Sequence, residues 1–127
     1  MVTKFRAFLT ETKTIHHVLQ IDLSRSMVSL KIENASEWYW FKEVVLMQST
    51  GLKDKNGVDI FEWDIVFDRW ANKYTPVFQN GIYMAYNPKN LMQNDPSTQF
   101  NIIWKDGCEV IGNIYENPEL LEQANEN

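Results

Sequence analysis

The stretch VVLMQSTGLKDKNGVDIFEWDIV, residues 44–66, decides the fold of this chain. Its first four residues are all apolar, which is typical of a strand covered on both faces. Further along, Val58 and Ile60 would share one face of a strand while Asp59 faces water. An apolar segment returns behind the acidic corner Glu62-Trp63-Asp64. The stretch therefore predicts consecutive short strands.

Two Asn-Gly pairs predict where strands turn back. Asn56-Gly57 lies inside the quoted stretch, and Asn80-Gly81 lies between the apolar segments 77–78 and 82–84. A two-residue type I′ turn needs positive φ at both central positions, which Gly adopts freely and Asn better than most residues. We therefore expect a hairpin at each pair, with a type I′ turn at residues 56–57.

Three blocks of the sequence resemble the YopX-like family, in the family's order. The central block comprises Leu46-Met47-Gln48, Thr50 to Gly57, Ile60-Phe61-Glu62 and Asp64-Ile65-Val66, and the outer blocks are Lys4-Phe5-Arg6-Ala7 and Cys108 to Leu121. These proteins are encoded mainly by phages and prophages of Gram-positive bacteria. The resemblance implies a small, β-rich, intracellular protein of phage origin without an assigned activity.

The chain departs from the family pattern at Trp63 and Ser49. The family usually has Gly where Trp63 stands and an aromatic residue where Ser49 stands. If that Gly adopts positive φ, the corner must be rebuilt here, because a bulky side chain resists that region. Trp63 is then either packed on a neighbouring strand, which we favour, or exposed for contact with a partner.

Length and composition describe one globular domain. The chain has 127 residues, of which 44% are hydrophobic and 13% aromatic, and its net charge is −5. Duplex binding depends on neutralising phosphates. Because the chain is acidic and has no cluster of Lys and Arg, we do not expect a nucleic-acid partner. A single cysteine and the absence of a long apolar run indicate a cytoplasmic protein with no membrane contact. The resemblance implies that the cytoplasm is that of a bacterial host cell.

We predict a single YopX-like domain over residues 1–127. It comprises an N-terminal β meander (1–43), the core motif (44–67), a variable loop region (68–99), and closing strands with a short helix (100–127). The fold class is mainly β, a small barrel or barrel-like antiparallel sheet of about eight short strands with a short C-terminal helix. Strands are expected at residues 2–8, 15–23, 27–32, 38–41, 100–104 and 109–115.

Residues 91–121 carry further local signals. Leu91 and Met92 are interpreted as a helical turn. Gly112 predicts a β-bulge or a close backbone approach within the closing strand. Asn117 and Pro118 predict the start of the final helix, with Asn117 as its N-cap.

The aromatic residues are the only candidates for an interaction site. In Trp38-Tyr39-Trp40-Phe41, alternate side chains would face opposite sides of a strand, so both faces need cover. The core is the favoured cover and another subunit is the alternative. Weak interaction candidates are Trp38, Trp40, Trp63 and Trp70.

No group of residues indicates catalysis. His16 and His17 are adjacent, so on a strand they point to opposite faces and cannot easily share a metal ion. Cys108 is interpreted as a small buried side chain and not as a nucleophile. Glu62 and Asp64 are interpreted as turn residues and not as a catalytic pair. We therefore expect no catalytic residue, no metal and no cofactor.

The favoured hypothesis is a non-enzymatic phage or prophage accessory protein. It would act through contacts with an unknown host or phage protein, with self-association as a further expectation. The alternative is a small-barrel module that binds single-stranded nucleic acid through exposed aromatics.

Overall fold

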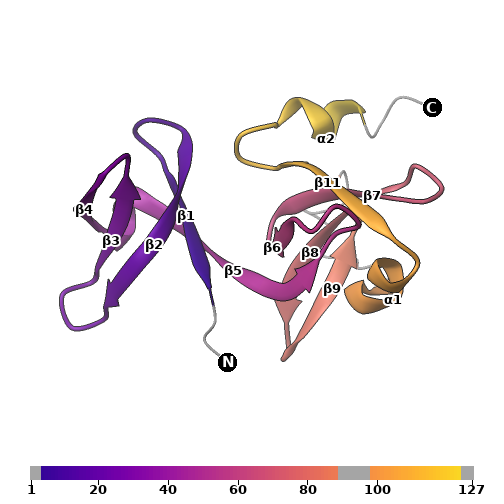
Figure 1. Cartoon of the computed structure of the whole chain (residues 1–127), viewed down its shortest axis with the longest axis horizontal. Coiled ribbons are helices and arrows are strands. Elements are labelled where there is room, and N and C mark those ends of the chain that lie inside the picture. Colours follow the sequence, from indigo (N-terminus) through magenta and orange to yellow (C-terminus); the bar gives the residue numbers. More distant parts are fainter. Residues whose placement is uncertain (1–3, 89–97, 124–127) are drawn as a thin grey trace. The chain divides into compact units, whose positions relative to one another are not determined.

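The computed structural model describes residues 4–88 and 98–123, and these form two compact units (Figure 1). The units are 1–49 and 50–127, so their boundary falls inside the predicted core motif 44–67. Two compact units can belong to one domain, and the single-domain expectation stays a prediction. The elements in chain order are β1 (Phe5–Leu9), β2 (Thr14–Asp22), β3 (Met27–Ile32), β4 (Ala35–Trp40), the 3₁₀ turn η1 (Phe41–Glu43), β5 (Val44–Lys53), β6 (Asp59–Phe61), β7 (Asp64–Asp68), β8 (Lys73–Gln79), β9 (Ile82–Tyr86), β10 (Thr98–Gln99), α1 (Phe100–Lys105), β11 (Cys108–Asn113) and α2 (Glu119–Gln123).

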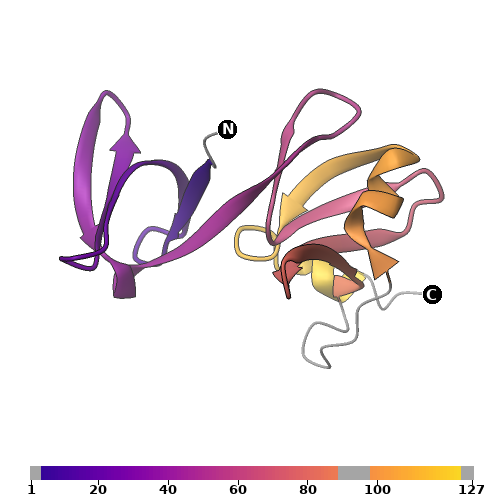
Figure 2. The same cartoon turned by 90° about the horizontal axis from the view of Figure 1, so that it is seen from below.

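The first unit is an antiparallel sheet in the order β4-β3-β2-β1-β5. It contains the predicted meander, and β3 has the bounds expected from its strict alternation. Figure 2 shows these strands bending around the interior of the unit. Strand β4 is hydrogen-bonded to β3 but not to β5, so the sheet is barrel-like without closing.

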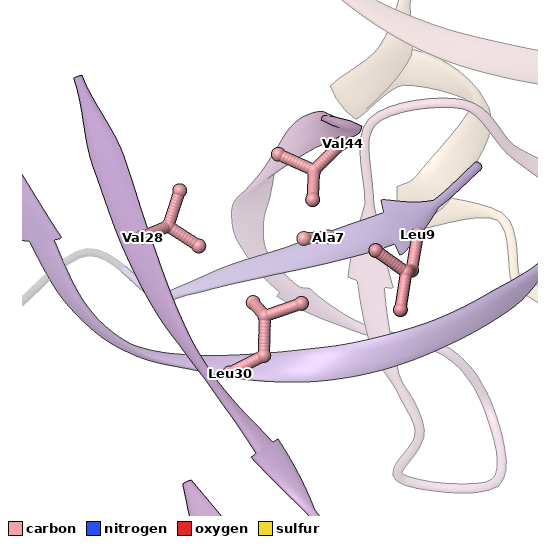
Figure 3. Close-up of a cluster of buried hydrophobic side chains, with 5 residues drawn as sticks. All are labelled: Ala7, Leu9, Val28, Leu30 and Val44. Carbon is pink, nitrogen blue, oxygen red and sulfur yellow. The ribbon is translucent and has the colours of Figure 1, made fainter. Parts of the chain in front are cut away.

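The core of the first unit comes from alternate residues of β1 and β3 and from the start of β5. Five buried side chains form it: Ala7, Leu9, Val28, Leu30 and Val44 (Figure 3). Tyr39 and Phe41 pack against this cluster from the β4 side. Half of the aromatic run at residues 38–41 therefore serves the core.

The second unit contains the sheet β10-β9-β8-β7-β11, with the end of β5 beside β6. Strand β5 thus runs from the first unit into the second. Residues 68–99, expected to be mainly loop, contain β8 and β9. The core here is formed by Ile60, Val66, Ala85, Phe100 and Cys108.

The predicted strand at residues 100–104 is wrong. Phe100–Lys105 is the helix α1, which places fully buried Phe100 and half-buried Ile103 and Trp104 against the second core. Their spacing of three and four residues is the spacing of one helix face. Trp104 also donates its indole N–H to the Lys53 carbonyl at 2.7 Å, which fixes the helix against the end of β5.

Both predicted hairpins are present, but the expected turn type is found only at residues 80–81. Asn80 and Gly81 have φ of 55° and 88°, as a type I′ turn requires. At the first hairpin only Gly57 has positive φ, and the Asp54 N–H reaches the Val58 carbonyl at 2.8 Å. This is a three-residue loop ending in a left-handed Gly, so the type I′ expectation at residues 56–57 is wrong.

The closing strand and the final helix are present as predicted. The change concerns Asn117, which was expected to cap the helix. The register of β11 shifts between Val110 and Gly112, as a bulge does. A Cβ on Gly112 would overlap the side chain of Asn117, so the strand needs Gly there. The Asn117 side chain accepts the backbone N–H of Asn113 at 3.1 Å and is directed back to β11, whereas α2 begins at Glu119.

No helix in residues 4–88 and 98–123 is long and apolar enough to cross a membrane. The expected helical turn at Leu91-Met92 lies outside the described residues.

Candidate interaction surface on strand β4

Strand β4 places two tryptophans on the outer face of the first unit. Trp38 pairs with Ser29 and Trp40 pairs with Met27, whereas Tyr39 pairs with the core residue Val28. Trp38 and Trp40 are 46% and 48% exposed. The expectation that the core covers both faces of this run is therefore wrong for these two side chains.

The hydrogen bonds of β4 show which backbone groups face outwards. The Phe41 N–H donates to the Ser26 carbonyl at 2.8 Å. In an antiparallel ladder, hydrogen-bonded and non-hydrogen-bonded pairs alternate, so this bond sets the phase. Ala35, Glu37 and Tyr39 direct their backbone groups to β3. The backbone groups of Ser36, Trp38 and Trp40 point away from the sheet.

One of these outward groups already has a partner. The Trp40 N–H donates to the Glu43 carboxylate at 3.2 Å. Glu43 itself is fixed by Thr10, whose N–H and hydroxyl both donate to the Glu43 carbonyl, at 3.1 and 2.9 Å. Of the three residues whose backbone N–H groups point outwards, Ser36 and Trp38 therefore remain to pair with an added strand.

Carboxylates lie near Tyr39 on β4. The Tyr39 hydroxyl donates to the Glu37 carboxylate at 2.7 Å. This bond raises the pKa of Tyr39 to about 12, with burial and the charges of Glu37, Glu11 and Glu43 adding in the same direction. Three carboxylates thus act on one phenol beside the exposed tryptophans, while the exposed Lys31 lies opposite Ser36 on the tryptophan face.

The other two candidate tryptophans lie in the second unit. Trp63 is half-buried and adopts φ of 69°. Trp63 itself therefore occupies the left-handed region, and a positive φ at this position does not require the corner to be rebuilt. Its N–H donates to the Pro76 carbonyl and its carbonyl accepts the Ile114 N–H, at 3.1 and 3.0 Å. These two bonds hold the strained conformation, and Trp63 is not an exposed contact residue.

Trp70 is the most exposed of the four candidates. It is 61% exposed in the turn after β7, and the Arg69 guanidinium lies 4.7 Å from its ring centroid. In this turn Trp70 is a single exposed tryptophan, whereas Trp38 and Trp40 form a pair along one strand face.

The two carboxylates of the acidic corner accept hydrogen bonds from the backbone. The Asp64 carboxylate is fully buried and accepts the Phe61 N–H at 2.8 Å. The Glu62 carboxylate accepts the Phe78 N–H at 3.1 Å. Each carboxylate thus holds a neighbouring backbone segment, as the interpretation of Glu62 and Asp64 as turn residues requires.

The histidines and the cysteine also have structural surroundings. His16 Nε2 lies 2.7 Å from the Thr14 hydroxyl. Cys108 is buried, and burial, together with the charges of Asp54 and Asp68, raises the pKa of its thiol to about 11. Within the described residues, no three His, Cys, Asp or Glu side chains are grouped as a metal site requires.

Sequence reasoning missed three buried residues that hold backbone N–H groups. Asp54 accepts from Asn56, Val58 and Val110 at 2.8, 2.9 and 2.9 Å. Asp68 accepts from Trp70 and Asn72 at 2.8 and 2.9 Å, and Asn113 accepts from Tyr115 and Glu116 at 3.0 and 2.8 Å. The available signal was an Asp or Asn at a strand end, two residues before the N–H that it binds.

The described chain is a mainly β protein with two antiparallel sheets and two short α-helices. The YopX protein family matches residues 4–122, so the chain belongs to this family, as the resemblance indicated. The chain is similar to the crystal structure of protein EF1440 from Enterococcus faecalis, with 35% identity and a TM-score of 0.61. That similarity covers 95% of this chain and 99% of EF1440. None of the curated proteins matches the chain.

Proposed function

We propose that this protein is a non-enzymatic accessory protein of phage or prophage origin that acts by contacting another protein through β4. Its place of action would be the cytoplasm of the bacterial host. The observation that carries the proposal is the pair Trp38 and Trp40, both about half exposed on one face of an edge strand. Tryptophan is enriched among the residues that dominate binding energy in protein interfaces.

The non-enzymatic part of the proposal is supported by the roles of the reactive side chains. Glu62 and Asp64 hold backbone N–H groups. The raised pKa of Cys108 keeps its thiol protonated at neutral pH, and the thiol is the weakly nucleophilic form. These structural roles support the proposal that the three side chains are not catalytic.

The test compares two variants in affinity capture from host cells. We expect the wild type and Trp70→Ser to retain the same phage or host protein. The variant Trp38→Ser/Trp40→Ser should not retain that protein, because both exposed indole rings of β4 are removed. Identical captured proteins for all three would contradict the use of β4.

The alternative function, binding of single-stranded nucleic acid, uses the same two rings as stacking platforms. The carboxylates of Glu37, Glu11 and Glu43 near Tyr39 oppose a phosphate backbone, which favours a protein partner. Retention on single-stranded DNA at low salt, lost in Trp38→Ser/Trp40→Ser, would replace the protein partner with nucleic acid.

A further inference from the structure

We propose that the edge of β4 binds an extended, Lys- or Arg-bearing segment of the partner protein, which adds to the sheet as a new strand. This inference rests on the proposed function and specifies its mode and the chemistry of its partner. Strand addition supplies affinity through main-chain hydrogen bonds and specificity through alternate side chains.

The backbone of β4 is prepared for a short added strand. Ser36 and Trp38 direct their N–H and carbonyl groups outwards, two residues apart, as the phase set by Phe41 and Ser26 requires. The next outward N–H, at Trp40, is bound to Glu43. A partner strand therefore pairs along residues 35–38 and ends at the Glu43 carboxylate.

A second copy of this chain fits the edge poorly. Two antiparallel registers would use the outward groups of both Ser36 and Trp38. Pairing Ser36 with the other copy's Trp38 sets the two Glu37 side chains directly opposite each other, which destabilises a sheet. Pairing Trp38 with its own equivalent requires the Trp40 N–H that Glu43 already holds. A second copy of β4 therefore pairs less well with this edge than a strand of a different sequence can.

The Glu37 carboxylate on β4 selects the foreign strand. Side chains of the added strand on the Tyr39 side would lie next to Glu37, and their neighbours in sequence would lie beside Trp38. Lys or Arg opposite Glu37 forms a cross-strand ion pair. On the other face, which also carries the exposed Lys31, an apolar side chain of the added strand packs beside the Trp38 ring. An alternating basic and apolar segment satisfies both faces of β4.

The experiment measures tryptophan fluorescence of the full chain titrated with two synthetic peptides, alternating Lys-Val and alternating Glu-Val. We expect the Lys-Val peptide to bind at least about tenfold more tightly, a ratio that falls as salt rises. Equal binding of the two peptides would overturn the charge assignment. Glu37→Gln should weaken the Lys-Val peptide, and the matched control Glu33→Gln, in the adjoining turn, should not.

A proline variant separates strand addition from other contacts. Ser36 and Lys31 face each other as a non-hydrogen-bonded pair, so Ser36→Pro removes an outward N–H without breaking the ladder to β3. We expect Ser36→Pro to keep the wild-type circular dichroism spectrum and to lose at least about tenfold in Lys-Val affinity. If the spectrum changes, N-methylation of alternate Lys-Val backbone nitrogens removes the ladder from the ligand side and must cause the same loss.

The outcomes distinguish the two levels of the proposal. Unchanged peptide binding in Ser36→Pro, or to the N-methylated peptide, overturns strand addition while leaving protein contact through Trp38 and Trp40 standing. Capture of the partner by Trp38→Ser/Trp40→Ser overturns the proposed function itself. A dimer in light scattering at tens of micromolar that Ser36→Pro abolishes assigns the edge to a second copy and overturns the foreign strand.

Discussion

At the scale of single residues, buried side-chain oxygens in the second unit accept hydrogen bonds from backbone N–H groups. Asp54 binds three backbone N–H groups, two within its own turn and one from Val110 on β11. Burial acts to raise the pKa of Asp54, but these bonds and nearby Lys55 outweigh it and lower the pKa below 3.8. Asp54 therefore ties the central hairpin to the closing strand as a carboxylate.

The lowered pKa of Asp54 predicts acid-sensitive stability. Because the folded-state pKa lies below the unfolded value, the stabilisation is present above pH 3.8 and is lost as the pH falls through the folded-state pKa. Asp54→Asn should lower the free energy of unfolding by about 1–3 kcal/mol at pH 7. The difference from the wild type should shrink as the pH falls.

Urea unfolding at several pH values checks this prediction. Asp106→Asn, on an exposed residue of the same unit, is the control and should leave the pH profile unchanged. A difference between Asp54→Asn and wild type that stays constant down to pH 2 would contradict the role of the charged form.

At the scale of elements, two hairpin turns of the second unit follow one plan. Residues 54–58 and 68–72 each begin with a buried Asp whose carboxylate accepts the N–H groups two and four residues later. Each also has a left-handed residue at the fourth position, Gly57 in one and Ala71 in the other, with φ of 82° and 64°. Ala71 carries a Cβ where the plan favours glycine.

The shared plan predicts opposite effects of two exchanges. Ala71→Gly should raise the free energy of unfolding by about 0.5–1 kcal/mol, because it relieves left-handed strain at a small entropic cost. Gly57→Ala should lower it by about 1 kcal/mol through φ alone, since no atom lies within 4 Å of a Cβ built there. Thermal and urea unfolding of both variants measure the difference, and the same sign for both would contradict the plan.

The sequence predicted these elements where the signal is local. The alternation at 27–32 located β3, and both Asn-Gly pairs located hairpins. Helix α1 was missed because Phe100, Ile103 and Trp104 belong to a short segment in which helix and strand periods are hard to separate. The exposure of Trp38 and Trp40 was missed because it depends on which strand lies at the edge, and pairing partners distant in sequence decide that.

At the scale of the whole molecule, the described residues contain two clusters of buried side chains, one in each unit. Leu30 belongs to the first and Val66 to the second, and the two clusters share no residue. A cavity in one cluster should therefore be felt first in its own unit.

Hydrogen exchange tests this division. Leu30→Ala should cost about 2–5 kcal/mol through lost burial and a cavity, and amides of residues 4–49 should exchange faster before those of 50–123 do. Val66→Ala, the matched change in the second cluster, should give the reverse order. Uniform acceleration across the chain in both variants would show a single cooperative unit.

We expect the length of strand β5 to be constrained by its pairing. Its first half pairs with β1 and its second half lies beside β6, along one uninterrupted run of ten residues (Figure 1). Adding or deleting one residue within the part that pairs with β1, residues 44–48, would shift the register of the residues beyond it. Insertions among members of the family should therefore gather in the connecting loops, while the interval between Val44 and Lys53 is inherited without gaps.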